Sequence, residues 1–309
     1  MNRAPANPAF LFPGHGGYLP GGLQEFADDF AGLPSVLERI TAASRAAGGP
    51  DVAELLTDRA APTLRSLVDD DPGRLHLAIF ATELCLHEIY TRSWGLAPAV
   101  LVGHSLGEFA ALVAAGCLSP ETGVRLVVER DEALRSTGLR QGGMVALRAD
   151  RRAAERLLAW LADDHTVLAV DNGEDQVVVS GLAEPLRRLA GRAADAGVEA
   201  TWLRVPYPFH NALLAEAAAR FSAVVDTIDC RAPEVPVHSP VLGREVRRPA
   251  DVREVLASHL VRPVGFRDAL KSLNAQGHRV YLECGGKAVL TNLVRSARER
   301  DVVATPGAA

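Results

Sequence analysis

The pattern of apolar and polar positions predicts alternating strands and helices along most of the chain. Short apolar runs at 9–12 and 100–102 have the length of buried strands, and a further strand is expected at 280–283. Residues 75–90 are apolar on nearly every side, which is typical of a helix inside a protein, and a last helix is expected over 289–298. Buried strands that alternate with helices predict an α/β protein whose main sheet is mostly parallel.

A different order of elements is predicted between residues 142 and 204. In sequence these are a strand, a helix, two strands separated by the turn Asn172–Asp175, a second helix and a final strand (143–147, 151–161, 167–170, 176–180, 185–196, 200–205). The order β-α-β-β-α-β within about 60 residues is the ferredoxin-like pattern. We therefore expect a small ferredoxin-like subdomain of residues 142–204, inserted in a large α/β-hydrolase-like subdomain formed by residues 1–141 and 205–309.

The strand predicted at 100–102 leads into the most informative motif of the chain. Gly103-His104-Ser105-Leu106-Gly107 matches G-x-S-x-G, and Glu108 begins a helical pattern. Strand, tight turn and helix in this order are the context of a nucleophile elbow, in which the serine lies on a strained turn above the sheet. Ser105 is therefore the candidate nucleophile, and the helix N-terminus behind it offers N–H groups to an oxyanion.

Four other positions carry candidate chemistry, and each has a structural alternative. Pro13–Gly17 follows the first strand, where glycines allow close approach to a ligand or form a simple turn. His210 ends a loop with two prolines, a rigid mount for a general base. Arg130 lies in a charged run that is typical of a solvated helix face, and His76 lies on the apolar helix, where a satisfied core histidine is common.

Composition and charge exclude several classes of function. The chain has 309 residues, 48% of them hydrophobic and 23% charged, which is ordinary for a globular protein. A net charge of −5 argues against binding nucleic acid, and the four scattered cysteines show neither a disulfide framework nor metal-ligand spacing. No signal-peptide pattern and no apolar run of membrane-spanning length are present. We expect a cytoplasmic protein, a monomer, with no bound metal or cofactor and no contact with membranes.

Taken together, these segments resemble the malonyl-CoA:acyl-carrier-protein transacylase family, which includes the acyltransferase domains of polyketide synthases. Phe12–Gly16 is similar to the family's F-P-G-Q-G motif, and Gly103–Glu108 to its G-H-S-x-G-E elbow. The remaining segments follow in the family's order, from about residue 9 to residue 298 (Val124–Arg130, Gly143–Ala146, Asn172–Gly181, Pro208–His210, Arg262–Val264, Glu283–Lys287).

The resemblance implies a role for each candidate residue. Ser105 is the nucleophile and His210 its base, with the imidazole oriented by a backbone carbonyl, which alignment assigns to His259. The oxyanion hole consists of the backbone N–H groups of Leu106 and His15. Four further residues are implied to bind the substrate, with Arg130 pairing with the malonyl carboxylate (Arg130, Phe209, Gln176, His76).

The reaction implied by the resemblance is a ping-pong transfer of an acyl group, most simply malonyl, from acyl-CoA to the phosphopantetheine thiol of an acyl carrier protein through an acyl-serine. Leu106 and Phe209 resemble the residues of malonyl-selecting enzymes, whereas Tyr207 differs from the histidine often found there. Three family glutamines are replaced by His15, His76 and His259, which is either neutral or alters the choice of acyl group.

Three alternatives remain open at this point. The chain could transfer a non-malonyl group, such as an aminoacyl or peptidyl group, between carriers, or it could hydrolyse stalled acyl groups. Arg130 counts against both, because neither reaction needs a carboxylate clamp. A non-catalytic carrier-docking protein is disfavoured by the presence of both Ser105 and His210.

Overall fold

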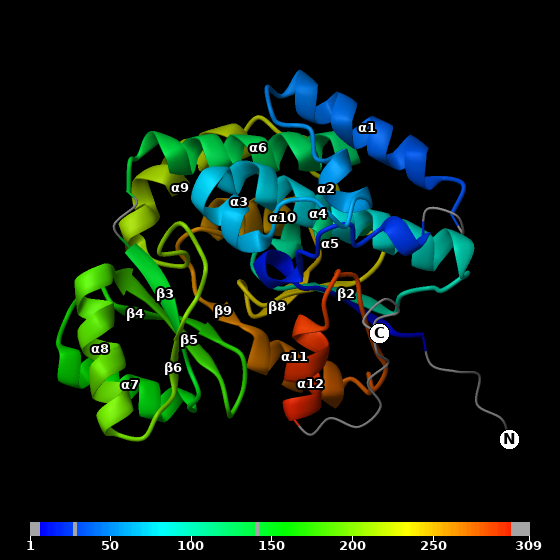
Figure 1. Ribbon diagram of the computed structural model, residues 1–309. Helices are drawn as coiled ribbons and strands as arrows, with labels where there is room; N and C mark the ends of the chain where they lie inside the picture. The colour runs from blue at the N-terminus through cyan, green and yellow to red at the C-terminus, as the bar shows by residue number, and fades with distance from the viewer. Residues whose placement is uncertain (1–6, 27–29, 140–141, 298–309) are drawn as a thin grey trace, which may run out of the picture.

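Two five-stranded sheets organise the computed structural model, which describes residues 7–26, 30–139 and 142–297 (Figure 1). The first sheet has the order β10-β1-β2-β7-β8, with parallel pairing except between β7 and β8. The prediction of a mostly parallel main sheet is therefore confirmed. Its strands are short (β1 Ala9–Phe12, β2 Val100–Gly103, β7 Val237–Ser239, β8 Arg244–Val246, β10 Tyr281–Glu283).

Helices cover both faces of this sheet. The larger helical layer lies above it in Figure 1 (α1 Leu33–Ala46, α2 Ala53–Thr57, α3 Leu64–Asp70, α4 Pro72–Glu88, α5 Gly107–Ala114, α6 Pro120–Ser136, α9 Ala215–Val225, α10 Pro249–Ser258). On the other side lie α11 (Phe266–Ala275) and α12 (Val289–Ser296). No helix in the described part of the chain combines the length and the apolar character needed to cross a membrane.

The two faces of β1 show why its run of apolar residues is uninterrupted. Successive side chains of a strand point to opposite faces. Phe10 and Phe12 accordingly join the core beneath α4 and α5, whereas Ala9 and Leu11 pack with the residues of α11 and α12. Both faces are buried, so every position of the strand is apolar.

The second sheet contains the predicted β-α-β-β-α-β order (β3 Gly142–Leu147, α7 Arg151–Leu161, β4 Val167–Asp171, β5 Val177–Leu182, α8 Ala183–Asp195, β6 Ala200–Trp202). Its strand order is β6-β3-β5-β4-β9, antiparallel among β3 to β6. The fifth strand, β9 (Val264–Gly265), comes from outside residues 142–204 and pairs parallel with β4. The small sheet is thus fastened to the large subdomain by backbone hydrogen bonds as well as by the connecting chain.

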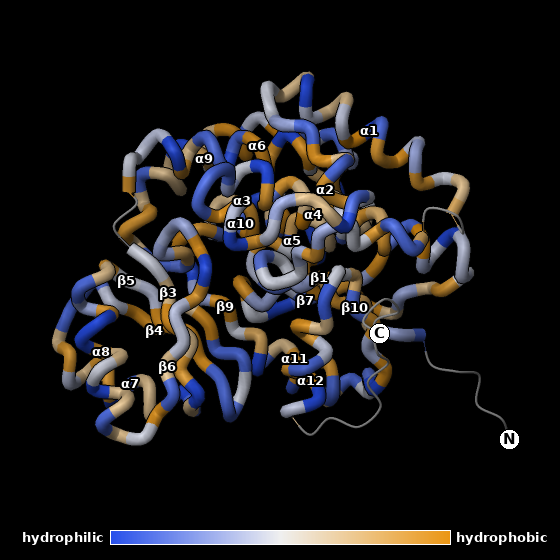
Figure 2. The backbone as a smooth tube through the Cα atoms, viewed as in Figure 1, coloured by the Kyte–Doolittle hydropathy of each residue, from blue (hydrophilic) through white to orange (hydrophobic). Residues whose placement is uncertain are grey.

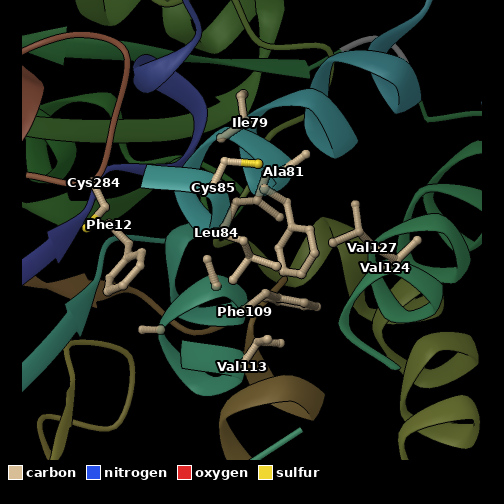
Figure 3. Packing of buried hydrophobic residues seen from close by; sticks show 14 of the residues in the cluster. Phe12, Ile79, Ala81, Leu84, Cys85, Phe109, Val113, Val124, Val127 and Cys284 are labelled. Carbon is tan, nitrogen blue, oxygen red and sulfur yellow. The ribbon is translucent and has the colours of Figure 1, made fainter. Parts of the chain in front are cut away.

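The main core lies between the elbow helix and its neighbours. Figure 3 shows Phe109 and Val113 of α5 gathered with Leu84 of α4 and with Val124 and Val127 of α6. Figure 2 shows hydrophobic segments inside the helical layer, whereas α1 at its outer side carries both hydrophobic and hydrophilic residues, as a helix with one buried side does. Because α5 is buried on nearly all sides, the turn at its N-terminus has a rigid support.

Candidate active site

Ser105 lies at the turn between β2 and α5, as the motif predicts. Its φ angle is +54°, in the left-handed region that costs a residue with a side chain about 1–3 kcal/mol. The flanking glycines are required by packing: a Cβ on Gly107 would lie 2.1 Å from the Phe12 oxygen, and one on Gly103 would lie 2.2 Å from the Glu108 nitrogen. The turn is therefore strained and tightly enclosed, and it presents the serine side chain at the end of the strand.

His210 is brought to Ser105 across 105 residues of sequence. The distance from Ser105 Oγ to His210 Nε2 is 2.8 Å, and Nδ1 lies 2.8 Å from the carbonyl oxygen of Arg262. A carbonyl can only accept, so Nδ1 carries the proton and Nε2 is left to accept from the serine hydroxyl. Burial lowers the pKa of His210 to about 3, which keeps the ring neutral and able to take a proton.

The carbonyl that orients His210 differs from the expectation. The hydrogen bond goes to Arg262, whereas alignment assigned this role to His259, whose backbone has only a lesser effect on the pKa of His210. Arg262 follows the end of α10 and precedes β9, so its carbonyl is left outside the regular helix. The His259 side chain instead packs edge-on against Phe109 and the His210 ring, and both of its nitrogens are buried without a hydrogen-bond partner among the described residues.

The glycine turn after β1 lies directly against the elbow. A Cβ on Gly14 would lie 2.4 Å from the His104 oxygen and 3.3 Å from the Leu106 nitrogen, so only glycine fits there. The Gly14 N–H donates to Glu83 Oε1 at 2.6 Å, and burial raises the pKa of Glu83 well above its usual value. The Leu106 N–H has no hydrogen-bond acceptor within the described part of the chain. The two segments expected to supply an oxyanion hole are therefore adjacent, and one donor is free.

A cavity of about 490 Å³ opens beside Ser105 and His210, between the two subdomains. Besides Ser105 and His210, three further candidate residues line it, namely His15, Phe209 and Gln176. Most of the other lining residues are apolar and come from β3, β4, β5, the loop after β6 and α12 (Met144, Ala146, Val170, Val178, Leu203, Val205, Val289, Leu290, Leu293). We call this space the Ser105 cavity. Its apolar lining would help to keep water away from a reactive ester.

A chain of hydrogen bonds joins the elbow to the small subdomain. His104 Nε2 lies 2.8 Å from Asn172 Oδ1, and Asn172 Nδ2 donates to Gln176 Oε1 at 2.7 Å. Gln176 is therefore fixed by its neighbour on the turn between β4 and β5. Asn172 is a site residue that the sequence pattern does not predict, because asparagine in a turn has an ordinary structural explanation.

Arg130 and His76 are buried together but are absent from the described lining of the Ser105 cavity. The guanidinium carbon of Arg130 lies 5.0 Å from the centre of the Phe209 ring, which does line the cavity. Arg130 Nη1 donates to Asp131 Oδ1 at 3.0 Å, and His76 Nδ1 lies 2.7 Å from the same oxygen. The charged run on α6 is therefore not all solvated: Arg130 is only 2% exposed.

Comparisons with known proteins agree with this geometry. The acyl transferase domain family matches residues 9–306. The chain belongs to this family. It is 31% identical to the malonyl CoA-acyl carrier protein transacylase of Bacillus subtilis, over 94% of this chain and 90% of that one. It is also 31% identical to a non-reducing polyketide synthase of Pseudevernia furfuracea, over 73% of this chain, but it spans only 11% of that much longer protein.

Among solved structures, this acyl transferase family chain is similar to a malonyl-transacylase in complex with its type II polyketide synthase acyl-carrier protein. That likeness has a TM-score of 0.88 and 26% identity, and it covers 98% of this chain and 97% of the other. The α/β fold with two sheets is thus the acyl transferase fold. Within the described ranges, no group of three or more His, Cys, Asp or Glu is arranged to bind a metal ion.

Proposed function

We propose that this protein transfers a malonyl group from coenzyme A to the phosphopantetheine thiol of an acyl carrier protein. The observation that carries the proposal is the Ser105–His210–Arg262 arrangement at the mouth of a largely apolar cavity. It is supported by membership of the acyl transferase family and by similarity to malonyl transacylases that use acyl carrier proteins.

In the first half-reaction, His210 Nε2 takes the proton of the Ser105 hydroxyl as Oγ attacks the thioester carbon. The tetrahedral intermediate places its negative oxygen toward the backbone N–H groups of Leu106 and His15. The C–S bond then breaks, the proton on Nε2 passes to the departing sulfur of coenzyme A, and a malonyl-serine ester remains.

The second half-reaction reverses these steps with another thiol. His210 Nε2 accepts the proton of the phosphopantetheine thiol, and the sulfur attacks the ester carbon. The C–O bond breaks and Ser105 Oγ recovers the proton from the imidazole. A neutral His210 is needed at the start of each half-reaction, and burial of the ring supports this state.

Three residues are proposed to bind the acyl group. Arg130 provides the positive charge for the malonyl carboxylate, a task that suits a planar guanidinium. Phe209 lines the Ser105 cavity and packs against the guanidinium of Arg130, and its bulk limits the room for a branched group. Gln176, fixed by Asn172, offers its amide to the thioester arm.

The experiment is the intact mass of the protein after mixing with malonyl-CoA, acetyl-CoA or a malonylated carrier protein. We expect one malonyl adduct on the unaltered protein, none on Ser105→Ala, and an unchanged adduct on Ser222→Ala, a serine of α9 outside the site. Arg130→Ala should slow malonyl loading by at least about tenfold, because it removes a charge-assisted hydrogen bond. An adduct that forms only from an acylated carrier would overturn the assignment of malonyl-CoA as donor.

A further inference from the structure

The guanidinium proposed to bind the malonyl carboxylate already has a carboxylate partner from its own chain. Arg130 Nη1 donates to Asp131 Oδ1 at 3.0 Å, and the two side chains are only 2% and 14% exposed. Because solvent screens a buried ion pair only weakly, the attraction between the Arg130 guanidinium and the Asp131 carboxylate is substantial. Any second carboxylate that approaches Arg130 meets a site whose positive charge is partly neutralised.

The surroundings show that Asp131 does not satisfy the whole guanidinium. It reaches Nη1 alone, and Arg130 Nε is buried without a hydrogen-bond partner in the described part of the chain. Asp131 Oδ2 is likewise buried and unpartnered, whereas Oδ1 also accepts from His76 Nδ1. One edge of Arg130 is thus left for another acceptor, and one oxygen of Asp131 is left without a donor.

A polar cavity beside Asp131 can accept its side chain. Asp131 lines this second cavity of about 400 Å³, together with Tyr207, Arg135 and two further acids, Asp70 and Asp71. This second cavity is distinct from the Ser105 cavity, since the two share no lining residue. When a substrate carboxylate takes Arg130, Asp131 can therefore turn toward a polar space rather than be trapped in the apolar core.

We propose that Asp131 is a specificity-determining residue: as a built-in competitor for Arg130, it lowers the preference for a carboxylated acyl group over a neutral one. The inference rests on the proposed function of Arg130 as the malonyl clamp. Binding of malonyl must either displace Asp131 from Nη1 or place two carboxylates around one guanidinium. Both lower the affinity for malonyl, whereas an acetyl group leaves the Arg130–Asp131 pair intact.

The test compares acylation of Ser105 by malonyl-CoA and by acetyl-CoA in the unaltered protein and in Asp131→Asn. Asparagine keeps the size and an oxygen for His76 but removes the competing charge. We expect the ratio of malonyl to acetyl loading to rise by about tenfold, mainly through a lower KM for malonyl-CoA. Glu132→Gln is the matched control, because this neighbouring acid is exposed and pairs with Arg135, and its ratio should not change.

A double-mutant cycle shows whether Asp131 acts through Arg130. In an Arg130→Ala background, adding Asp131→Asn should leave the malonyl-to-acetyl ratio unchanged. Both loading rates in a ratio come from the same protein sample, so a smaller fraction of folded protein lowers both equally and leaves the ratio unchanged.

A falling or unchanged ratio in Asp131→Asn alone would overturn the proposal, since Asp131 would then position Arg130 or have no effect on it. Malonyl loading that appears only in Asp131→Asn would support the role of Asp131 as a competitor for Arg130. It would also overturn malonyl as the acyl group of the unaltered protein. Absence of malonyl loading from both proteins would overturn both proposals.

Discussion

His210 shows at the scale of one residue how the site holds a base in its active form. Its φ angle is +59°, and its neighbour in the dyad, Ser105, is at +54°. Both backbones are strained, and hydrogen bonds at each end of the imidazole fix the ring. Desolvation disfavours the charged imidazolium, and the Arg262 carbonyl only partly offsets it, so the pKa falls to about 3. The base therefore stays neutral where a solvated histidine would be protonated.

The pH dependence of the first half-reaction should reflect this shift. A base must be unprotonated, so activity falls on the acid side only as pH approaches its pKa. We expect kcat/KM for malonyl-CoA to remain nearly constant from pH 8 down to about 5.5, rather than halve near the ordinary histidine value of about 6.5. Stopped-flow acylation, with folding checked by circular dichroism at each pH, measures this. An acid limb with an apparent pKa of 6 to 7 would contradict the burial argument.

At the scale of elements, the site depends on two turns that interlock. The turn after β1 and the N-terminus of α5 approach so closely that Gly14 and Gly107 have no room for a side chain. Glu108, the next residue of α5, accepts from Ser239 Oγ at 2.6 Å and from the Val241 N–H at 3.0 Å, which fastens the elbow helix to the end of β7 and the residues that follow it. The elbow is thus positioned by three strand ends, not by its own sequence alone.

Two glycines in helices test this interlock. Gly107→Ala places a Cβ 2.1 Å from the Phe12 oxygen, so we expect it to lose at least about 3 kcal/mol of unfolding free energy or to fail to fold. Gly191→Ala, in an open and exposed part of α8, should instead gain about 0.5–1 kcal/mol from helix propensity. Urea unfolding measures both. Equal effects of the two substitutions would show that close packing at the elbow is unimportant.

At the scale of the whole molecule, the buried titratable groups connect stability to pH. Burial lowers the pKa of seven histidines (His15, His87, His104, His210, His238, His259, His278). It raises the pKa of four carboxyls (Glu83, Glu108, Asp171, Glu283), that of Glu108 to about 8. The histidines bind protons more readily in the unfolded state, and these carboxyls bind them more readily in the folded state, so the two sets oppose each other.

The histidines should dominate on acidification. Below about pH 6.5 the unfolded chain gains protons at seven histidines whose pKa is lowered in the folded protein, against four carboxyls that favour the folded state. We expect the unfolding free energy to decrease from about pH 6 to pH 4, most steeply below about 4.5, where the carboxyls no longer compensate. Urea titrations at fixed pH values provide the measurement. Constant or rising stability over this range would contradict the excess of buried neutral histidines.

The sequence predicted the fold class, the order of elements in the small subdomain and the elbow at Ser105, because these depend on local patterns. Short apolar runs of strand length and glycines at fixed offsets are recognised from a few neighbouring residues. It missed α11 and the two-residue strand β9, whose pairing with β4 is a long-range contact without a signal of its own. Alignment assigned the orienting carbonyl to His259, whereas the 2.8 Å hydrogen bond goes to Arg262, because every residue of that loop has a carbonyl and its direction in space selects among them.

The sequence by itself determined which side chains could perform the chemistry. The tertiary structure decided the burial, the charge state and the partners of each one. A motif of five residues is enough to predict a nucleophile, since the strain and the helix that follow it are local. The charge state of His210, the burial of Arg130 and its pairing with Asp131 arise only when helices α4 and α6 and the Phe209 loop come together. Solvation and Coulomb interactions depend on distance in space, and distance along the chain does not determine them.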